Sequence, residues 1–119
     1  MTNQNQKTDI LAVKLVPGPN GAPLGKVIRV RDVNKAIEKN VSSNFEEVTS
    51  RLVDVAFDLP VNVVFSLGST GRVIDFANVY FIGPVMIFGK DYDGRVQSLS
   101  RAEIHAIAYF CASFRYSEE

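Results

Sequence analysis

Apolar and polar residues alternate in the first third of the chain, a pattern typical of β-strands. Residues Ile10–Val16 and Lys26–Arg31 alternate on either side of Pro17–Gly25, a segment rich in glycine and proline that excludes regular structure. Two neighbouring strands in a short chain pair readily. We therefore expect them to form a hairpin with a long loop.

The apolar spacing changes to a helical period after Arg31. Asp32 is placed to cap a short helix that runs through Lys39, and Ser43–Glu46 forms a second capping box for a helix to about Asp58. The second helix would bury one apolar stripe, which consists of Phe45, Val48, Leu52, Val55, Ala56 and Leu59. A single kinked helix over 32–58 is the alternative, because the same stripe continues through both segments.

The alternating pattern returns after Pro60 and predicts four or five more strands. Their expected positions are Val61–Leu67, Arg72–Phe76, Val79–Ile82, Val85–Phe88 and Arg95–Leu99. Gly83–Pro84 indicates a bend, a bulge or an edge, because proline cannot donate to a central ladder. Asp91–Gly94 is a hairpin turn signal.

The last predicted helix, Ser100–Phe114, is apolar on nearly every side. Ser100 and Glu103 form a capping box at its start. One stripe would face the sheet, and a second stripe of Ala106, Phe110 and Ser113 would remain. A small domain rarely covers a helix on both sides, so we expect these three residues to form an interface in a homodimer or larger homo-oligomer.

Together these elements predict a two-layer α+β fold. Along the chain the expected order is strand-strand-helix-several strands-helix, the sheet is mainly antiparallel, and both helices lie on one of its faces. Residues 1–9 are polar and predict a disordered tail, and residues 10–119 predict a single domain.

The formal net charge is zero, so a protein that coats nucleic acid is not expected. The single cysteine favours a reducing, cytoplasmic location, and neither a signal peptide nor a membrane span is expected.

The residues that carry most enzyme chemistry are scarce. The chain has one histidine, His105, and one cysteine, Cys111. Six positions apart on one helix, they would lie about 240° apart around its axis and cannot form a nucleophile–base pair. Cys111 is expected to be a small structural core residue. We therefore expect a protein that is not an enzyme and that uses no metal and no cofactor.

The residues best suited to bind a ligand are arginines and a glycine turn. Arg29 and Arg31 share a strand face, and Arg72 follows a turn of Gly68, Ser69, Thr70 and Gly71 whose N–H groups would suit a phosphate. This set predicts a non-catalytic homo-oligomeric protein that binds a small anionic ligand such as a nucleotide, using arginines and aromatic side chains. The alternative is a protein–protein interaction module, such as an inhibitor, adaptor or assembly factor, that uses the apolar last helix.

Overall fold

The structure, a computed structural model, describes residues 9–90 and 96–116. The tail expected over residues 1–9 lies outside this part of the chain except for Asp9, and so does the turn expected at Asp91–Gly94. The described residues form a mixed α+β fold that is mostly strand. Its strands and helices are β1 (Ile10–Val16), β2 (Leu24–Val30), α1 (Val33–Asn40), β3 (Val48–Asp54), β4 (Pro60–Ser66), β5 (Val73–Phe76), β6 (Val79–Ile82), β7 (Val85–Lys90), β8 (Val96–Gln97), α2 (Arg101–Tyr109) and β9 (Ser113–Arg115).

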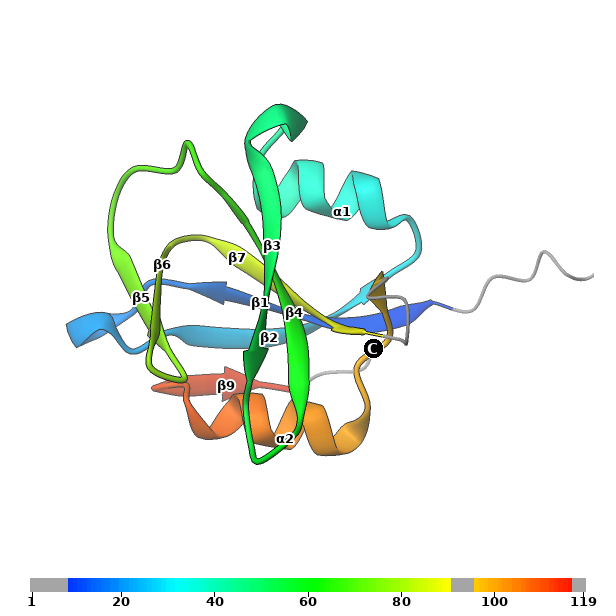
Figure 1. Ribbon diagram of the computed structural model, residues 1–119, viewed down its shortest axis with the longest axis vertical. Coiled ribbons are helices and arrows are strands. Elements are labelled where there is room, and N and C mark those ends of the chain that lie inside the picture. The colour runs from blue at the N-terminus through cyan, green and yellow to red at the C-terminus, as the bar shows by residue number, and fades with distance from the viewer. Residues whose placement is uncertain (1–8, 91–95, 117–119) are drawn as a thin grey trace, which may run out of the picture.

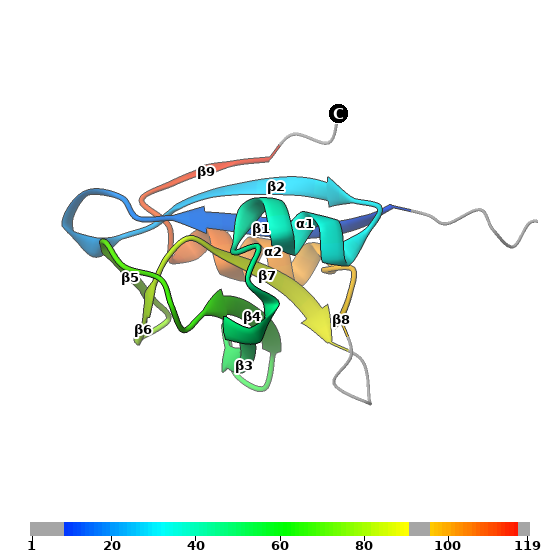
Figure 2. The same ribbon diagram turned by 90° about the horizontal axis from the view of Figure 1, so that it is seen from above.

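The main sheet has the strand order β3-β4-β7-β1-β2-β9, with β8 paired to β7 and with β5-β6 as a separate hairpin. Two hairpins, β1-β2 and β3-β4, are joined in the middle by β7 and cross at a steep angle (Figure 1). The described pairings are antiparallel apart from β2 with β9. Figure 2 shows β9 along the outer side of β2 and the β3-β4 hairpin at the other edge. The expected β1-β2 hairpin with its long loop and the mainly antiparallel sheet are confirmed.

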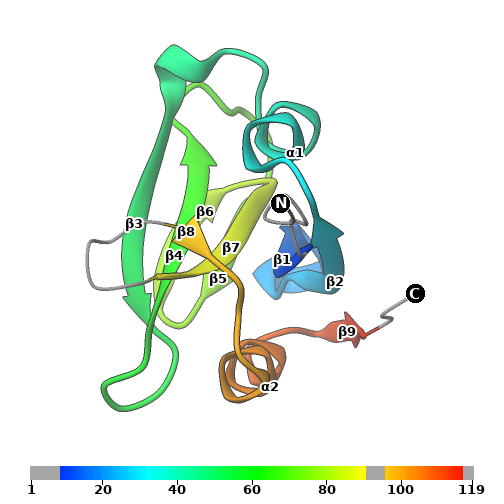
Figure 3. The ribbon, with the colours of Figure 1, turned by 90° about the vertical axis from the view of Figure 1, so that its right-hand side faces the viewer.

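The two helices lie on opposite faces of the sheet, so our expectation of both helices on one face was wrong (Figure 3). Successive residues of β7 point to opposite faces. Ile87 packs in the core that contains Ile104 of α2, whereas Met86 packs in the core that contains Ile37 of α1. The central strands are thus buried on both sides, and each side requires its own helix.

The short helix expected from Asp32 through Lys39 is confirmed as α1, with Asp32 as its N-cap. The second helix, expected to end near Asp58, is absent, and so is the alternative single kinked helix over 32–58. Residues Phe45–Glu47 form one turn of 3-10 helix, and the chain then becomes β3. Every residue of β3 has a partner on β4, from Val48 opposite Ser66 to Asp54 opposite Pro60. The helical stripe was misleading because Phe45 and Leu52 are about half exposed, while tertiary pairing with β4 decides the conformation.

The last helix is shorter than expected. Its capping box is confirmed, since Ser100 accepts from the backbone N–H of Glu103 and Glu103 accepts from that of Ser100. However, α2 ends at Tyr109, and β9 replaces its expected final turn. The chain leaves the helix because β9 pairs with β2, and the backbone N–H of Ala112 donates to the carbonyl of Pro23. Phe114 lies against Gly25, where a Cβ on residue 25 would come within 2.7 Å of the Phe114 ring.

The second apolar stripe of α2 is largely covered by the same chain. Ala106 and Phe110 are partly buried against the core beneath α2, and the rings of Phe110 and Phe76 meet edge-on with centroids 5.7 Å apart. Ser113 is exposed, but it lies on β9 rather than on the helix. Self-association stays a prediction, but Phe110, which we expected to be left uncovered, packs against Phe76 of β5 within the same chain.

We predict that Phe110→Ala lowers the free energy of unfolding by about 2–3 kcal/mol, because it removes a partly buried ring and leaves a void beside Phe76. The matched control is Phe57→Ala, where the side chain is 99% exposed and the change should stay within about 0.5 kcal/mol. Denaturant unfolding at two protein concentrations measures both. Equal losses for the two variants would contradict packing of Phe110 within one chain, and a wild-type midpoint that rises with protein concentration would indicate self-association.

Candidate functional site

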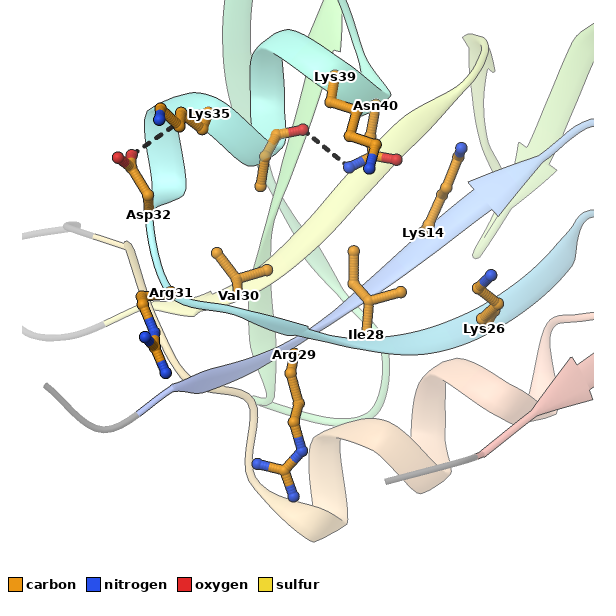
Figure 4. A pocket seen from close by; sticks show the side chains of 11 residues that line it. Lys14, Lys26, Ile28, Arg29, Val30, Arg31, Asp32, Lys35, Lys39 and Asn40 are labelled. Carbon is orange, nitrogen blue, oxygen red and sulfur yellow. Dashed lines mark hydrogen bonds between the residues drawn. The ribbon is translucent and has the colours of Figure 1, made fainter. Parts of the chain in front are cut away.

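A cleft of about 520 Å³ lies between α1 and the β1-β2 hairpin (Figure 4). We call it the α1 cleft. Its apolar side chains, Ile28, Val30 and Ala36, belong to the core beneath α1. Four lysines line it as well: Lys14 and Lys26 come from the strands, and Lys35 and Lys39 come from the helix. Positive charge therefore surrounds a partly aliphatic floor.

The two strand lysines lie directly opposite each other in the sheet. The hairpin register pairs Lys14 of β1 with Lys26 of β2. Side chains at opposite positions of an antiparallel pair have Cβ atoms about 5 Å apart, and like charges there destabilise the sheet. Figure 4 shows both lysines pointing toward the helix side, where Lys39 lies above Lys14. This register thus concentrates positive charge at one place on the sheet.

The four lysines lack anionic partners in the described part of the chain. No ion pair or side-chain hydrogen bond of Lys14, Lys26, Lys35 or Lys39 is present there. Among the described residues that line the cleft, Asp32 is the single acidic one, and its carboxylate accepts from the backbone N–H of Lys35 as the cap of α1. A bound anion would supply the missing negative charge.

The arginines that we expected to bind a ligand border this cleft but point away from it. Arg29 and Arg31 lie on one face of β2, as alternation requires, and this is the face opposite Lys26, Ile28 and Val30 (Figure 4). Arg31 forms an ion pair with Asp9, with its Nε 3.1 Å from the carboxylate. These two arginines therefore contribute to the edge of the cleft rather than to its charged interior.

The glycine turn lies at the other end of β2. Arg72 donates to the carbonyl of Pro17 at 3.5 Å, and Pro17 is adjacent to the Val16–Leu24 pair that begins the hairpin. Roughly 20 Å of strand separates this end from Arg31. The structure thus divides the expected ligand-binding residues into two groups that cannot hold one small ligand.

The turn itself is poorly prepared for an anion. The backbone N–H groups of Leu67, Gly68 and Ser69 donate to Glu47 O, Ser66 Oγ and Ser66 O, respectively. The carboxylate of Glu47 also lies directly against Gly68, at the position that a Cβ would occupy. A phosphate at this turn would meet backbone N–H groups that already donate within the chain, and it would meet a negative charge. Gly68, Ser69, Thr70 and Arg72 are therefore weaker candidates than the residues of the α1 cleft.

The remaining candidates lie on and after α2. His105 is exposed on the helix, and Cys111 is partly buried after its end. The Cys111 thiol contacts the carbonyl of Ile107 at 3.5 Å, and burial raises the pKa of this thiol to about 11. A thiol that holds its proton at neutral pH is a weak nucleophile.

No group of three or more metal-ligating side chains is found among the described residues. In the same part of the chain, neither helix is long and apolar enough to cross a membrane. No known protein family, curated protein or solved structure matches this chain. Any functional conclusion therefore depends on the geometry of the chain itself.

Sequence reasoning missed the four lysines of the α1 cleft, although part of the signal was present. Lys35 and Lys39 are four apart in a predicted helix and so share one face. Lys26 alternates with Ile28 and Val30 on a predicted strand. Only the hairpin register, which brings Lys14 opposite Lys26, shows that these charges meet, and alternation within each strand alone does not reveal that register.

We predict that Lys26→Gln raises the free energy of unfolding of the ligand-free protein by about 0.2–1 kcal/mol in low salt, because it relieves the repulsion with Lys14. The gain should disappear in about 1 M salt, where screening acts over about 3 Å. Arg51→Gln is the control, since Arg51 is an exposed strand cation outside the cleft. Destabilisation by Lys26→Gln in low salt would show that the lysines do not repel each other.

We predict that Cys111 reacts with thiol reagents about 100-fold more slowly in the folded protein than in denaturant at pH 8, because its pKa rises from 9.0 to about 11. The same shift stabilises the fold below pH 9, and this contribution is lost as pH rises through 11. Labelling rates measured across pH, in native and denaturing buffer, test the first statement, and denaturant unfolding between pH 8 and about pH 11 tests the second. A native rate that already levels off near pH 9 would contradict them.

Proposed function

We propose that the protein is a non-catalytic binding protein for a small phosphate-bearing anion, which it holds in the α1 cleft. The observation that carries the proposal is the direct pairing of Lys14 with Lys26, with Lys35 and Lys39 on the opposite wall and no anionic partner for these four in residues 9–90 and 96–116. Placing like charges together costs stability unless an anion lies between them.

The chemistry of the lining side chains favours phosphate in particular. An ammonium group is a compact charge on a flexible stem that adapts to several oxygens, and lysine commonly binds phosphate as a point charge. Lys14 is partly buried, so its charge acts in a less screened environment than that of the exposed Lys26. A doubly charged phosphate group gains more from this arrangement than a singly charged anion does.

None of the 11 residues that line the α1 cleft is aromatic. The base of a nucleotide would find no ring on which to stack there. This differs from the nucleotide pocket of arginines and aromatics that the sequence suggested. The proposal therefore keeps the anion and replaces the nucleotide with a ligand recognised through its phosphate groups.

A second candidate function is docking of a protein partner on the outer face of the β5-β6 hairpin. Val73 and Ile82 lie opposite each other there and are 45% and 40% exposed, and Tyr80 on the same face is 71% exposed. Neighbouring exposed apolar side chains of this kind mark interaction surfaces more often than isolated ones do. This is the interaction-module hypothesis, moved from α2 to the hairpin.

We predict that pyrophosphate binds the wild-type protein, and that Lys14→Gln and Lys39→Gln each weaken binding about ten- to a hundredfold, because each removes a charge-assisted contact worth about 1.5–3 kcal/mol. Calorimetry at low salt measures the affinities. Arg51→Gln and Arg72→Gln, which change the net charge equally outside the cleft, should bind as the wild type does. If no phosphate compound binds more tightly than millimolar, the anion-binding function is refuted and the hairpin surface becomes the better candidate.

A further inference from the structure

The positive charge of the α1 cleft continues across the sheet beyond the cleft. The parallel pairing of β2 with β9 places Arg115 beside Lys26, and the hairpin register places Lys26 opposite Lys14. The three side chains therefore occupy neighbouring positions on three adjacent strands. We call Arg115, Lys26 and Lys14 the cationic row.

Packing of the neighbouring residues shows which face the cationic row occupies. Phe114 packs into the core beneath α2, so Arg115, the next residue on β9, points to the other face, which α1 covers. Ala12 and Val30 pack into the core beneath α1, and alternation gives Lys14 and Lys26 the same direction. Strands are about 4.8 Å apart, so the row spans about 10 Å.

The two ends of the cationic row differ. Beyond Lys14, the next position in the row is the buried Met86 of β7, so the row ends against the core. At the other end, Arg115 lies on β9, the last strand of the sheet order. Within the described part of the chain, a ligand that follows the row is therefore closed off at Lys14 and open toward the β9 edge at Arg115.

We infer that the ligand is a linear chain of phosphates, anchored in the α1 cleft and extending along the cationic row over the β9 edge. This inference rests on the proposed function, because the same lysines hold the first phosphates. A row of about 10 Å accommodates a chain of a few linked phosphates. Lys39 of α1 lies near the anchored end, whereas Lys35 lies one helical turn away, beside Asp32 (Figure 4).

The lining favours an unsubstituted polyphosphate over a nucleic acid strand. Proteins that bind single strands combine a basic groove with aromatic side chains for the bases, and the α1 cleft contains no aromatic lining residue. Its cations are instead close together, which suits a chain with a charge at every phosphate and no base or sugar between them.

The test compares binding of pyrophosphate, tripolyphosphate and a medium-chain polyphosphate to the wild type, Arg115→Gln, Arg115→Lys and the control Arg51→Gln. We expect affinity to increase with chain length in the wild type. Arg115→Gln should weaken binding of the medium chain about tenfold and leave the affinity for pyrophosphate unchanged. For the medium chain, the slope of the logarithm of affinity against the logarithm of salt concentration should decrease in magnitude by about one. Arg115→Lys keeps the charge and should restore long-chain binding, which a purely structural role of Arg115 does not predict.

Two outcomes separate this inference from the proposed function. If pyrophosphate binds through Lys14 but longer chains gain nothing, or if Arg115→Gln binds the medium chain normally, the phosphate chain is refuted and the small-anion function stands. If none of these compounds binds, both are refuted. A single-stranded oligothymidylate is the remaining arm: binding as tight as that of polyphosphate, with the same dependence on Arg115, would replace polyphosphate by nucleic acid.

Discussion

Strands β1, β4 and β7 bury side chains on both of their faces, and the positions of the helices follow from this double burial. Val13 and Ile87 lie in the core beneath α2, whereas their neighbours Ala12 and Met86 lie in the core beneath α1. A strand with two buried faces needs a cover on each side, so the helices lie on opposite sides of the sheet. Helix α1 is only eight residues long, and the α1 cleft lies between it and the β1-β2 hairpin beside Lys14 and Lys26.

Under the proposed function, the α1 cleft maintains a site for an anion at a cost to the stability of the fold. Each lysine lies on an element whose position is determined by apolar neighbours: Ile28 and Val30 orient β2, and Ile37 anchors α1. The packing of these residues forces the charges of Lys14 and Lys26 together although they repel each other. Local rules of stability are violated most often at functional sites, which is why this pair is more informative than the exposed arginines elsewhere.

The parts of the fold that were predicted correctly depend on local signals. The Ser100–Glu103 capping box and the alternation on either side of the Pro17–Gly25 loop act over a few residues, and both are confirmed. The segment after Glu47 shows where local signals fail, since its spacing suits a helix but pairing with β4 makes it a strand. The site was missed for a related reason. Lys14, Lys26 and Arg115 become neighbours only through pairings of β1, β2 and β9, and parallel addition of a short terminal strand has no signature in composition or periodicity.

The central claim is that the face of the sheet beneath α1 binds phosphate. A nuclear magnetic resonance titration of the labelled protein with pyrophosphate tests it most directly, because backbone amides report every part of the described chain at once. The account predicts saturable shifts concentrated in β1, β2 and α1, near Lys14, Lys26 and Lys39. Shifts concentrated in the turn at Gly68–Arg72, or an unchanged spectrum at millimolar pyrophosphate, would contradict it.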